Sequence, residues 1–231
     1  MGVAGVILAA GESTRMGRDK GLLPWPRQRT SDASKHVGPD AAPSAAGRVR
    51  APAPTRALPG SGTLLSHNIA ALNGACDLVI VVVGENESIL RPIVDASGGF
   101  LVRNPRPDLG QFSSLRVGLQ EVLSHGRDSA MVTLVDRPCP ASTTLRFLLD
   151  VFDRRPRAIW SVIPEFKAQH GHPILIGREM IEEFLRAPST ANARDIEHAN
   201  QQRILYAPVD DPLVTTNINT PEDYASLQSK A

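Results

Sequence analysis

Short runs of consecutive apolar residues alternate along the chain with segments in which apolar residues recur every three or four positions. The apolar runs are bounded by glycine or polar residues, which is typical of strands buried on both faces of a parallel sheet. We predict strands at residues 3–10, 77–84 and 129–135, and shorter ones at 158–163 and 173–176.

The segments between these runs have the period of amphipathic helices. Apolar spacing predicts helices near residues 64–72, 89–94, 115–123, 145–152 and 180–185. A last helix is expected after Thr220, because threonine is a good N-cap, Pro221 suits the first turn and two acids follow. Strands and helices alternate, so the sequence predicts an α/β fold with a single Rossmann-like, mostly parallel sheet and helices on both faces.

Residues 26–62 interrupt this alternation. They hold six prolines and many Ala, Ser, Gly and Arg residues, with no hydrophobic period. Such a segment buries too little apolar surface to offset the entropy cost of ordering it. We therefore predict one domain over residues 1–231 with a flexible insertion at 26–62, and a lid over the active site is the alternative role of that insertion.

Composition narrows the class of protein. The chain has 231 residues, 42% of them hydrophobic, which is enough for one sizeable core. Its 25 basic and 24 acidic residues nearly cancel, which argues against a nucleic-acid partner or a polybasic membrane partner. The apolar runs are far shorter than the roughly 20 residues that span a bilayer, and no basic residue precedes the first one as in a secretory signal. We expect a cytoplasmic protein.

The densest group of chemically useful residues follows the first predicted strand. The chain there reads L-A-A-G from Leu8 to Gly11 and then passes through Arg15 to Lys20. Small residues expose backbone N–H groups that cradle phosphate oxygens, and Arg15 and Lys20 add a guanidinium fork and a point charge. The spacing alone is equally consistent with a basic surface turn.

The segment from Leu8 to Leu23 resembles the signature L-A-[AG]-G-x-S-x-R-M-G-x-x-K-x-L-L of the molybdopterin nucleotidyltransferases. Further motifs of that family resemble Asn104-Pro105 with Gly110–Leu119, Leu134–Pro138, His170–Pro173 and Asn217–Asp223. The resemblance covers nearly the whole chain outside the insertion. It implies a glycosyltransferase-A-like sheet and transfer of a nucleoside monophosphate from an NTP, with Mg²⁺ as cofactor.

The resemblance also implies roles for individual residues. Arg15, Lys20 and Asp136 would be catalytic, and Asp136, at the end of a buried strand, suits a Mg²⁺ that bridges triphosphate oxygens. Asn219 would be a second metal ligand, although many cytidylyl-type relatives carry Asp there. The nucleotide would contact Leu8, Ala9, Ala10, Gly11, Arg15, Lys20, Asn104, Ser113 and Ser114, and the acceptor would contact His172.

Structural roles are the alternatives for several of these residues. Ser113 and Ser114 lie near a predicted helix start, where either serine can serve as the N-cap. Asp136 can cap the helix that follows it, and Asn219 can belong to a turn before Thr220. A lone loop histidine such as His172 is often structural.

The sequence thus predicts transfer of CMP from CTP to the terminal phosphate of molybdenum-loaded molybdopterin, with release of pyrophosphate. Ala10 favours CTP, since the guanylyl form of the motif has glycine there and a methyl group would crowd a purine. The segment 18–23 resembles the guanylyl branch instead, so GTP is the alternative nucleotide. A sugar or alditol phosphate is the alternative acceptor. A non-catalytic carrier that delivers the cofactor to an apo-molybdoenzyme is the alternative class, against which the retained Arg15, Lys20 and Asp136 argue.

Overall fold

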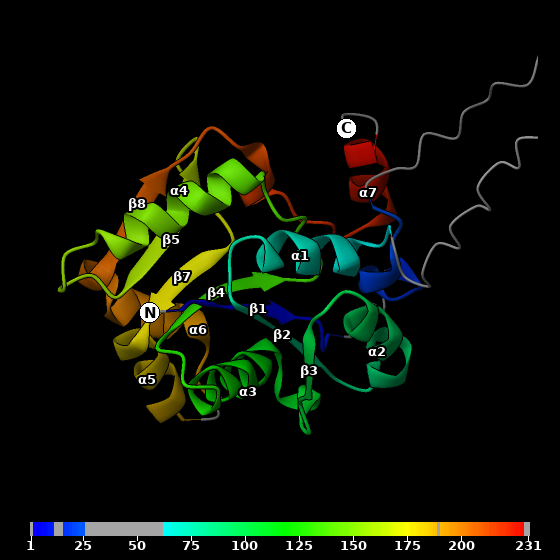
Figure 1. Ribbon diagram of the computed structural model, residues 1–231, viewed down its shortest axis with the longest axis horizontal. Coiled ribbons are helices and arrows are strands. Elements are labelled where there is room, and N and C mark those ends of the chain that lie inside the picture. The colour runs from blue at the N-terminus through cyan, green and yellow to red at the C-terminus, as the bar shows by residue number, and fades with distance from the viewer. Residues whose placement is uncertain (1, 12–15, 26–61, 189, 229–231) are drawn as a thin grey trace, which may run out of the picture.

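The computed structural model describes residues 2–11, 16–25, 62–188 and 190–228. In this part of the chain one eight-stranded sheet runs through the molecule (Figure 1). Its order is β3 (Phe100–Arg103), β2 (Leu78–Val83), β1 (Ala4–Leu8), β4 (Ser129–Leu134), β7 (Ile174–Gly177), β5 (Ser161–Phe166) and β6 (Gln169–His170), with β8 (Ile204–Pro208) paired to β5.

The strands β3, β2, β1 and β4 are parallel, and β8 is parallel to β5. Strand β7 runs antiparallel to both β4 and β5. The predicted α/β fold with a mostly parallel sheet is confirmed. The sequence pattern does not reveal that β7 is reversed, because a short buried strand looks the same in either direction.

Helices cover both faces of the sheet, as predicted. α1 (Leu64–Asn73), α2 (Glu87–Ala96) and α4 (Ser142–Asp153) pack on one face. α3 (Gln111–Ser124), α5 (Arg178–Arg186) and α6 (Ala193–Ala199) pack on the other. Strand β1 serves both layers, since Ile7 is buried in the first core and Val6 in the second. All five strands and all six helices predicted from the pattern are present, whereas β3, β6, β8 and α6 gave no sequence signal that we recognised.

Four short 3-10 helices complete the described elements. They are η2 (Lys20–Leu22), η3 (Pro107–Leu109), η4 (Gln201–Arg203) and η5 (Pro212–Thr215). No helix in the described ranges is long and apolar enough to cross a membrane.

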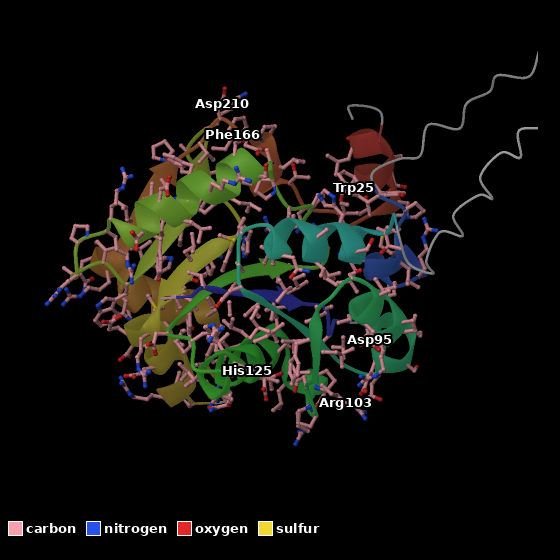
Figure 2. The ribbon with its side chains drawn as sticks, in the orientation of Figure 1. Trp25, Asp95, Arg103, His125, Phe166 and Asp210 are labelled. Atoms are coloured by element: carbon pink, nitrogen blue, oxygen red, sulfur yellow. The ribbon has the colours of Figure 1, made fainter. Side chains whose placement is uncertain are left out.

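The last helix, α7 (Pro221–Gln228), packs beside the loop that follows β1. Its predicted N-cap is present, because the Thr220 hydroxyl accepts the backbone N–H of Asp223 at 3.2 Å. The Tyr224 hydroxyl donates to the carbonyl oxygen of Pro24 at 2.5 Å. Figure 2 shows Trp25 at the end of α1 next to α7. A small buried cluster joins these elements: Leu23, Trp25, Leu64 and Ile218.

The two ends of the predicted insertion meet. The backbone N–H of Trp25 donates to the carbonyl oxygen of Gly62 at 2.7 Å, and Pro24 forms a β-bridge with Thr63. The chain therefore leaves and re-enters the domain at one place, beside η2. Residues 26–61, on which the predictions of flexibility and of a lid depend, lie outside the described residues.

Candidate functional site

The loops after β1 and β4 emerge side by side, because these parallel strands are neighbours with Leu8 opposite Leu134. The Lys20 ammonium donates to Oδ2 of Asp136 at 2.8 Å, so two of the three predicted catalytic residues are brought together. Their side chains are only 12% and 20% exposed. The pair lies at the carboxyl ends of the strands, where open α/β sheets bind ligands.

The residues around the end of β1 form the rim of this site. Leu8 and Ala9 are buried, Ala10 is half-buried and Gly11 is exposed. A Cβ placed on Gly84, at the end of β2, would lie 2.9 Å from the carbonyl oxygen of Ala10. Glycine is therefore required where these two loops approach each other. Arg15 lies outside the described residues.

Asp19 holds Lys20 in place from the preceding position. Its Oδ1 accepts the backbone N–H of Gly21 at 2.8 Å and so caps η2, whose first residue is Lys20. Its Oδ2 accepts a hydrogen bond from the amide of Asn86 at 2.6 Å.

Asn86 connects three segments and was missed by the sequence analysis. Besides its bond to Asp19, its Nδ2 donates to the carbonyl oxygen of Ala9 at 2.9 Å. Its Oδ1 accepts the backbone N–H of Gly84 at 3.0 Å. One amide thus ties the ends of β1 and β2 to the loop that carries Lys20. The available signal was an Asn two residues after the glycine that ends a buried strand.

Several buried polar atoms without a partner belong to Asp136 and to residues of the segments near it. Its Oδ1, Nε of Arg137, Nδ1 of His172 and Oδ1 of Asn217 are shut off from solvent and form no hydrogen bond to any described residue. The backbone N–H of Ile218 donates to the carbonyl oxygen of Asp136 at 2.9 Å, which brings the segment 217–219 alongside the end of β4. Buried polar atoms are normally paired, so these atoms indicate a place for a ligand, ion or water.

The two asparagines of this segment differ. Asn217, which the sequence analysis did not assign, has the buried amide oxygen. Asn219, the predicted second metal ligand, donates its backbone N–H to Oδ2 of Asp223 at 2.9 Å. The backbone N–H groups of Asn219 and Thr220, and then the charge of Lys20, hold the pKa of Asp223 below its ordinary value.

His172 enters the site just before β7. Its backbone N–H donates to the carbonyl oxygen of Val214 at 2.7 Å. The preceding Gly171 has no space for a side chain, because a Cβ there would overlap that same carbonyl group. Burial, and then the positive charge of Arg137, lower the pKa of His172 to about 3. The imidazole is therefore neutral near pH 7.

Asn104, Ser113 and Ser114 form one hydrogen-bonded group after β3. The Nδ2 of the buried Asn104 donates to the hydroxyls of Ser113 at 2.8 Å and Ser114 at 3.0 Å. Its Oδ1 accepts the backbone N–H of Arg106 at 2.9 Å. The N-cap of α3 is Gly110, with φ of 86°, so a serine N-cap is wrong.

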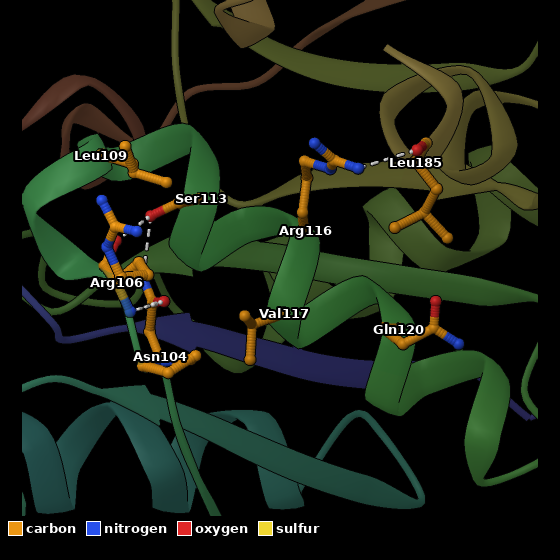
Figure 3. A pocket seen from close by; sticks show the side chains of 9 residues that line it. Asn104, Arg106, Leu109, Ser113, Arg116, Val117, Gln120 and Leu185 are labelled. Atoms are coloured by element: carbon orange, nitrogen blue, oxygen red, sulfur yellow. Dashed lines mark hydrogen bonds between the residues drawn. The ribbon is translucent and has the colours of Figure 1, made fainter. Parts of the chain in front are cut away.

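An open pocket of about 320 Å³ lies on the solvent side of α3 (Figure 3). Ser113 and Val117 line it, and a hydrogen bond of 3.0 Å from Arg116 to the carbonyl oxygen of Leu185 closes one side. Ser114 instead faces the sheet. Neither Lys20 nor Asp136 lines the pocket, so it is separate from that pair.

The site offers oxygen atoms that could bind a cation, but they do not come from a cluster of acidic side chains. No three His, Cys, Asp or Glu side chains of the described ranges gather into a metal-binding group. The free oxygens of Asp136 and Asn217 are of the type that Mg²⁺ prefers, and Mg²⁺ usually takes few protein ligands together with phosphate oxygens.

The chain is similar to one family model and to relatives whose names agree with that family. The model of the "MobA-like NTP transferase domain" matches residues 5–204. A probable molybdenum cofactor guanylyltransferase of Mycobacterium avium is 28% identical over 138 residues, which are 60% of this chain and 51% of that protein. The chain thus matches about half the length of that relative. The molybdenum cofactor cytidylyltransferase of Escherichia coli is 21% identical over 236 residues, covering 97% of this chain and 95% of the relative.

Solved structures share the fold. Rv0371c from Mycobacterium tuberculosis H37Rv has a TM-score of 0.71 at 23% identity, covering 99% of this chain and 97% of that one. Its complex with manganese has a TM-score of 0.68 at 23% identity, covering 100% of both chains. The molybdopterin-guanine dinucleotide biosynthesis protein A of Archaeoglobus fulgidus has a TM-score of 0.62 at 14% identity, covering 99% and 98%.

Stability is expected to depend on pH through His172. Because the pKa of His172 is lower in the folded state, His172 binds a proton in the unfolded chain at pH values where it stays neutral in the native state. This contribution to stability is complete above pH 6.5 and is lost as pH falls toward 3, by about 1.4 kcal/mol per pH unit. Chemical denaturation of wild type and His172→Gln between pH 7 and pH 4 measures it. The difference in free energy of unfolding between wild type and His172→Gln should become smaller as pH falls. A difference that does not change with pH would contradict the lowered pKa of His172.

Asn86→Asp should make stability pH-dependent in a different way. The new carboxyl group would face Oδ2 of Asp19, and two carboxylates at hydrogen-bond distance repel each other unless they share a proton. We expect a loss of about 1–3 kcal/mol at pH 8, because Ala9 and Asp19 lose their donor, and a partial recovery at pH 5. Denaturant melts at both pH values measure this. Asn73→Asp is the control, since the exposed Asn73 amide donates only to a backbone carbonyl. Equal pH profiles for the two variants would refute the role of Asn86.

Proposed function

Because the chain belongs to the family of MobA-like NTP transferase domains, we propose that it transfers CMP from CTP to the terminal phosphate of molybdenum-loaded molybdopterin. The observation that carries the proposal is the buried contact between Lys20 and Asp136 at the carboxyl ends of β1 and β4. It sets a cation and a carboxylate at the end of β1, the strand that leads into the exposed Gly11, and a triphosphate is a fitting ligand for this arrangement.

The proposed reaction requires no covalent bond between the substrates and a protein residue. An oxygen of the acceptor phosphate attacks the α-phosphorus of CTP and forms the new P–O bond. The bond from the α-phosphorus to the bridging oxygen breaks, and pyrophosphate leaves with that electron pair. The acceptor phosphate is already ionised, so no general base is needed. The residues supply positioning and charge: Lys20 compensates charge at the phosphates, and Asp19 and Asn86 hold its loop.

A divalent cation fits the donor atoms beside this pair. Asp136 offers a buried free oxygen, and Asn217 or Asn219 would add a neutral amide oxygen. Mg²⁺ bound there would compensate negative charge on the triphosphate and on the departing pyrophosphate. The manganese complex of the structurally similar Mycobacterium tuberculosis protein supports a divalent ion.

The choice of nucleotide rests on Ala10 and on the relatives. The match to the cytidylyltransferase of Escherichia coli extends over 97% of the chain, and the methyl group of Ala10 lies where the loops after β1 and β2 approach each other. The match to the guanylyltransferase of Mycobacterium avium, with higher identity over a shorter segment, favours GTP as the second candidate. In either case the product is a cofactor that an apo-molybdoenzyme would receive.

Lys20→Ala and Asp136→Asn are each expected to lower kcat by about 10²–10³, because each removes charge stabilisation at the reacting phosphates. The kcat of each variant is measured as pyrophosphate release with CTP, Mg²⁺ and molybdenum-loaded molybdopterin. The assay temperature is kept below the melting temperature of each variant. Asp150→Asn, on the exposed side of α4, is the control. Removing divalent ions with a chelator should abolish wild-type turnover, and Mg²⁺ should restore it. Turnover near the wild-type level in either variant would refute the site.

Ala10→Gly is expected to shift preference from CTP toward GTP by removing one methyl group from the rim of the site. A contact of this size is worth about 1–3 kcal/mol, so the switch should be partial. The ratio of kcat/KM for the two nucleotides, measured for wild type and variant with the same acceptor, gives the shift. An unchanged ratio would remove Ala10 as a selector of the base.

A further inference from the structure

Asp136 has two cationic neighbours, Lys20 and Arg137, that differ in their contacts. Lys20, from the loop after β1, donates to Asp136 Oδ2. The guanidinium of Arg137, the next residue, makes no hydrogen bond or ion pair to any residue in the described ranges, and its Nε is shut off from solvent. A half-buried charge of this kind loses hydration, and the nearby Asp136 carboxylate compensates it only in part, so an anion is a fitting ligand.

The backbone around Arg137 is held firmly. The fully buried Asn68 of α1 donates its amide to the carbonyl oxygen of Arg137 at 3.0 Å and accepts the backbone N–H of Cys139 at 2.9 Å. The N–H of Ile218 holds the carbonyl of Asp136 from the other side. The backbone from which the Arg137 side chain extends is therefore held by hydrogen bonds on both sides.

The surroundings of Arg137 do not cancel its charge. His172 is close enough for the charge of Arg137 to act on it, but the imidazole is neutral near pH 7. Burial lowers the pKa of Arg137, and the neighbouring Asp136 carboxylate offsets this only in part. No ion pair joins these two side chains. A guanidinium stays protonated in proteins, so a positive charge persists here.

We propose that Arg137 binds the phosphate of the acceptor and places it for attack on the nucleotide. Lys20 and the loop that carries it lie on the β1 side of Asp136, where the nucleotide is proposed to bind. The charge of Arg137 acts on His172, the residue that leads into β7 on the opposite side of β4. The inference rests on the proposed function and adds a specificity residue to it.

This role suits the chemistry of the guanidinium. Its planar fork of N–H groups binds two phosphate oxygens at once, which leaves the third free as nucleophile. An acceptor that lacks a phosphate would leave the half-buried guanidinium without its anion and would bind poorly. The site thus selects phosphate monoesters independently of the nucleobase.

Steady-state kinetics with Arg137→Gln, Arg137→Lys and the control Arg157→Gln test the proposal. Arg157 is exposed in the turn before β5. We expect Arg137→Gln to raise KM for molybdenum-loaded molybdopterin at least tenfold while KM for CTP changes less than twofold, with Arg137→Lys in between. A rise in KM for CTP with an unchanged acceptor KM would overturn the proposal, since the phosphate would then come from the nucleotide. Unchanged values for both substrates would also overturn it.

A binding measurement separates this inference from the proposed function. In ¹⁵N-labelled protein the Arg137 Nε–H resonance is identified by its absence from Arg137→Lys. Glycerol 3-phosphate should shift it saturably and glycerol should not. That result supports the phosphate site even if wild type transfers no nucleotide to molybdopterin. A resonance that responds to CTP but not to glycerol 3-phosphate, in folded protein, overturns the inference.

Discussion

The contact between Lys20 and Asp136 is the constraint on which the rest of the site depends. Two charged groups that are 12% and 20% exposed have lost most of their hydration, and each compensates the other. Removing one partner of such a pair typically costs about 3–5 kcal/mol, whereas the intact pair adds little net stability. The arrangement is therefore better explained by chemistry than by stability. It holds a cation and a carboxylate at the ends of adjacent parallel strands.

This constraint requires rigid loops, and distant segments provide the rigidity. Asn86 ties the loop after β2 to Ala9 and Asp19, so the position of Lys20 depends on β2 as well as on β1. Tyr224 of α7 fixes Pro24 at the far end of the same loop. Asn68 and Ile218 hold the backbone beyond β4. Four parts of the chain thus position two side chains.

Much of the fold followed from hydrophobic periodicity, and the failures have physical causes. β3 lies at an edge and is only partly buried, so it lacks the apolar run that marks a central strand. The direction of β7 depends on which strands it meets. In the site, Lys20 and Asp136 were each predicted as catalytic from a family motif that follows a strand, but their contact with each other was not predicted. Asn86, Arg137 and Asn217 were not predicted as site residues, because single polar residues in loops carry no periodic signal.

The sequence by itself determined the α/β class, the order of most strands and helices, the N-cap of α7 and the family motifs, because these depend on local spacing and on short segments. The tertiary structure alone decided which polar atoms are left without partners. Asp136 Oδ1, Arg137 Nε and Asn217 Oδ1 come from segments separated by about 80 residues, and their burial is a result of packing between β4 and the chain before α7. Whether a polar group is satisfied depends on its neighbours in space, which no local pattern specifies.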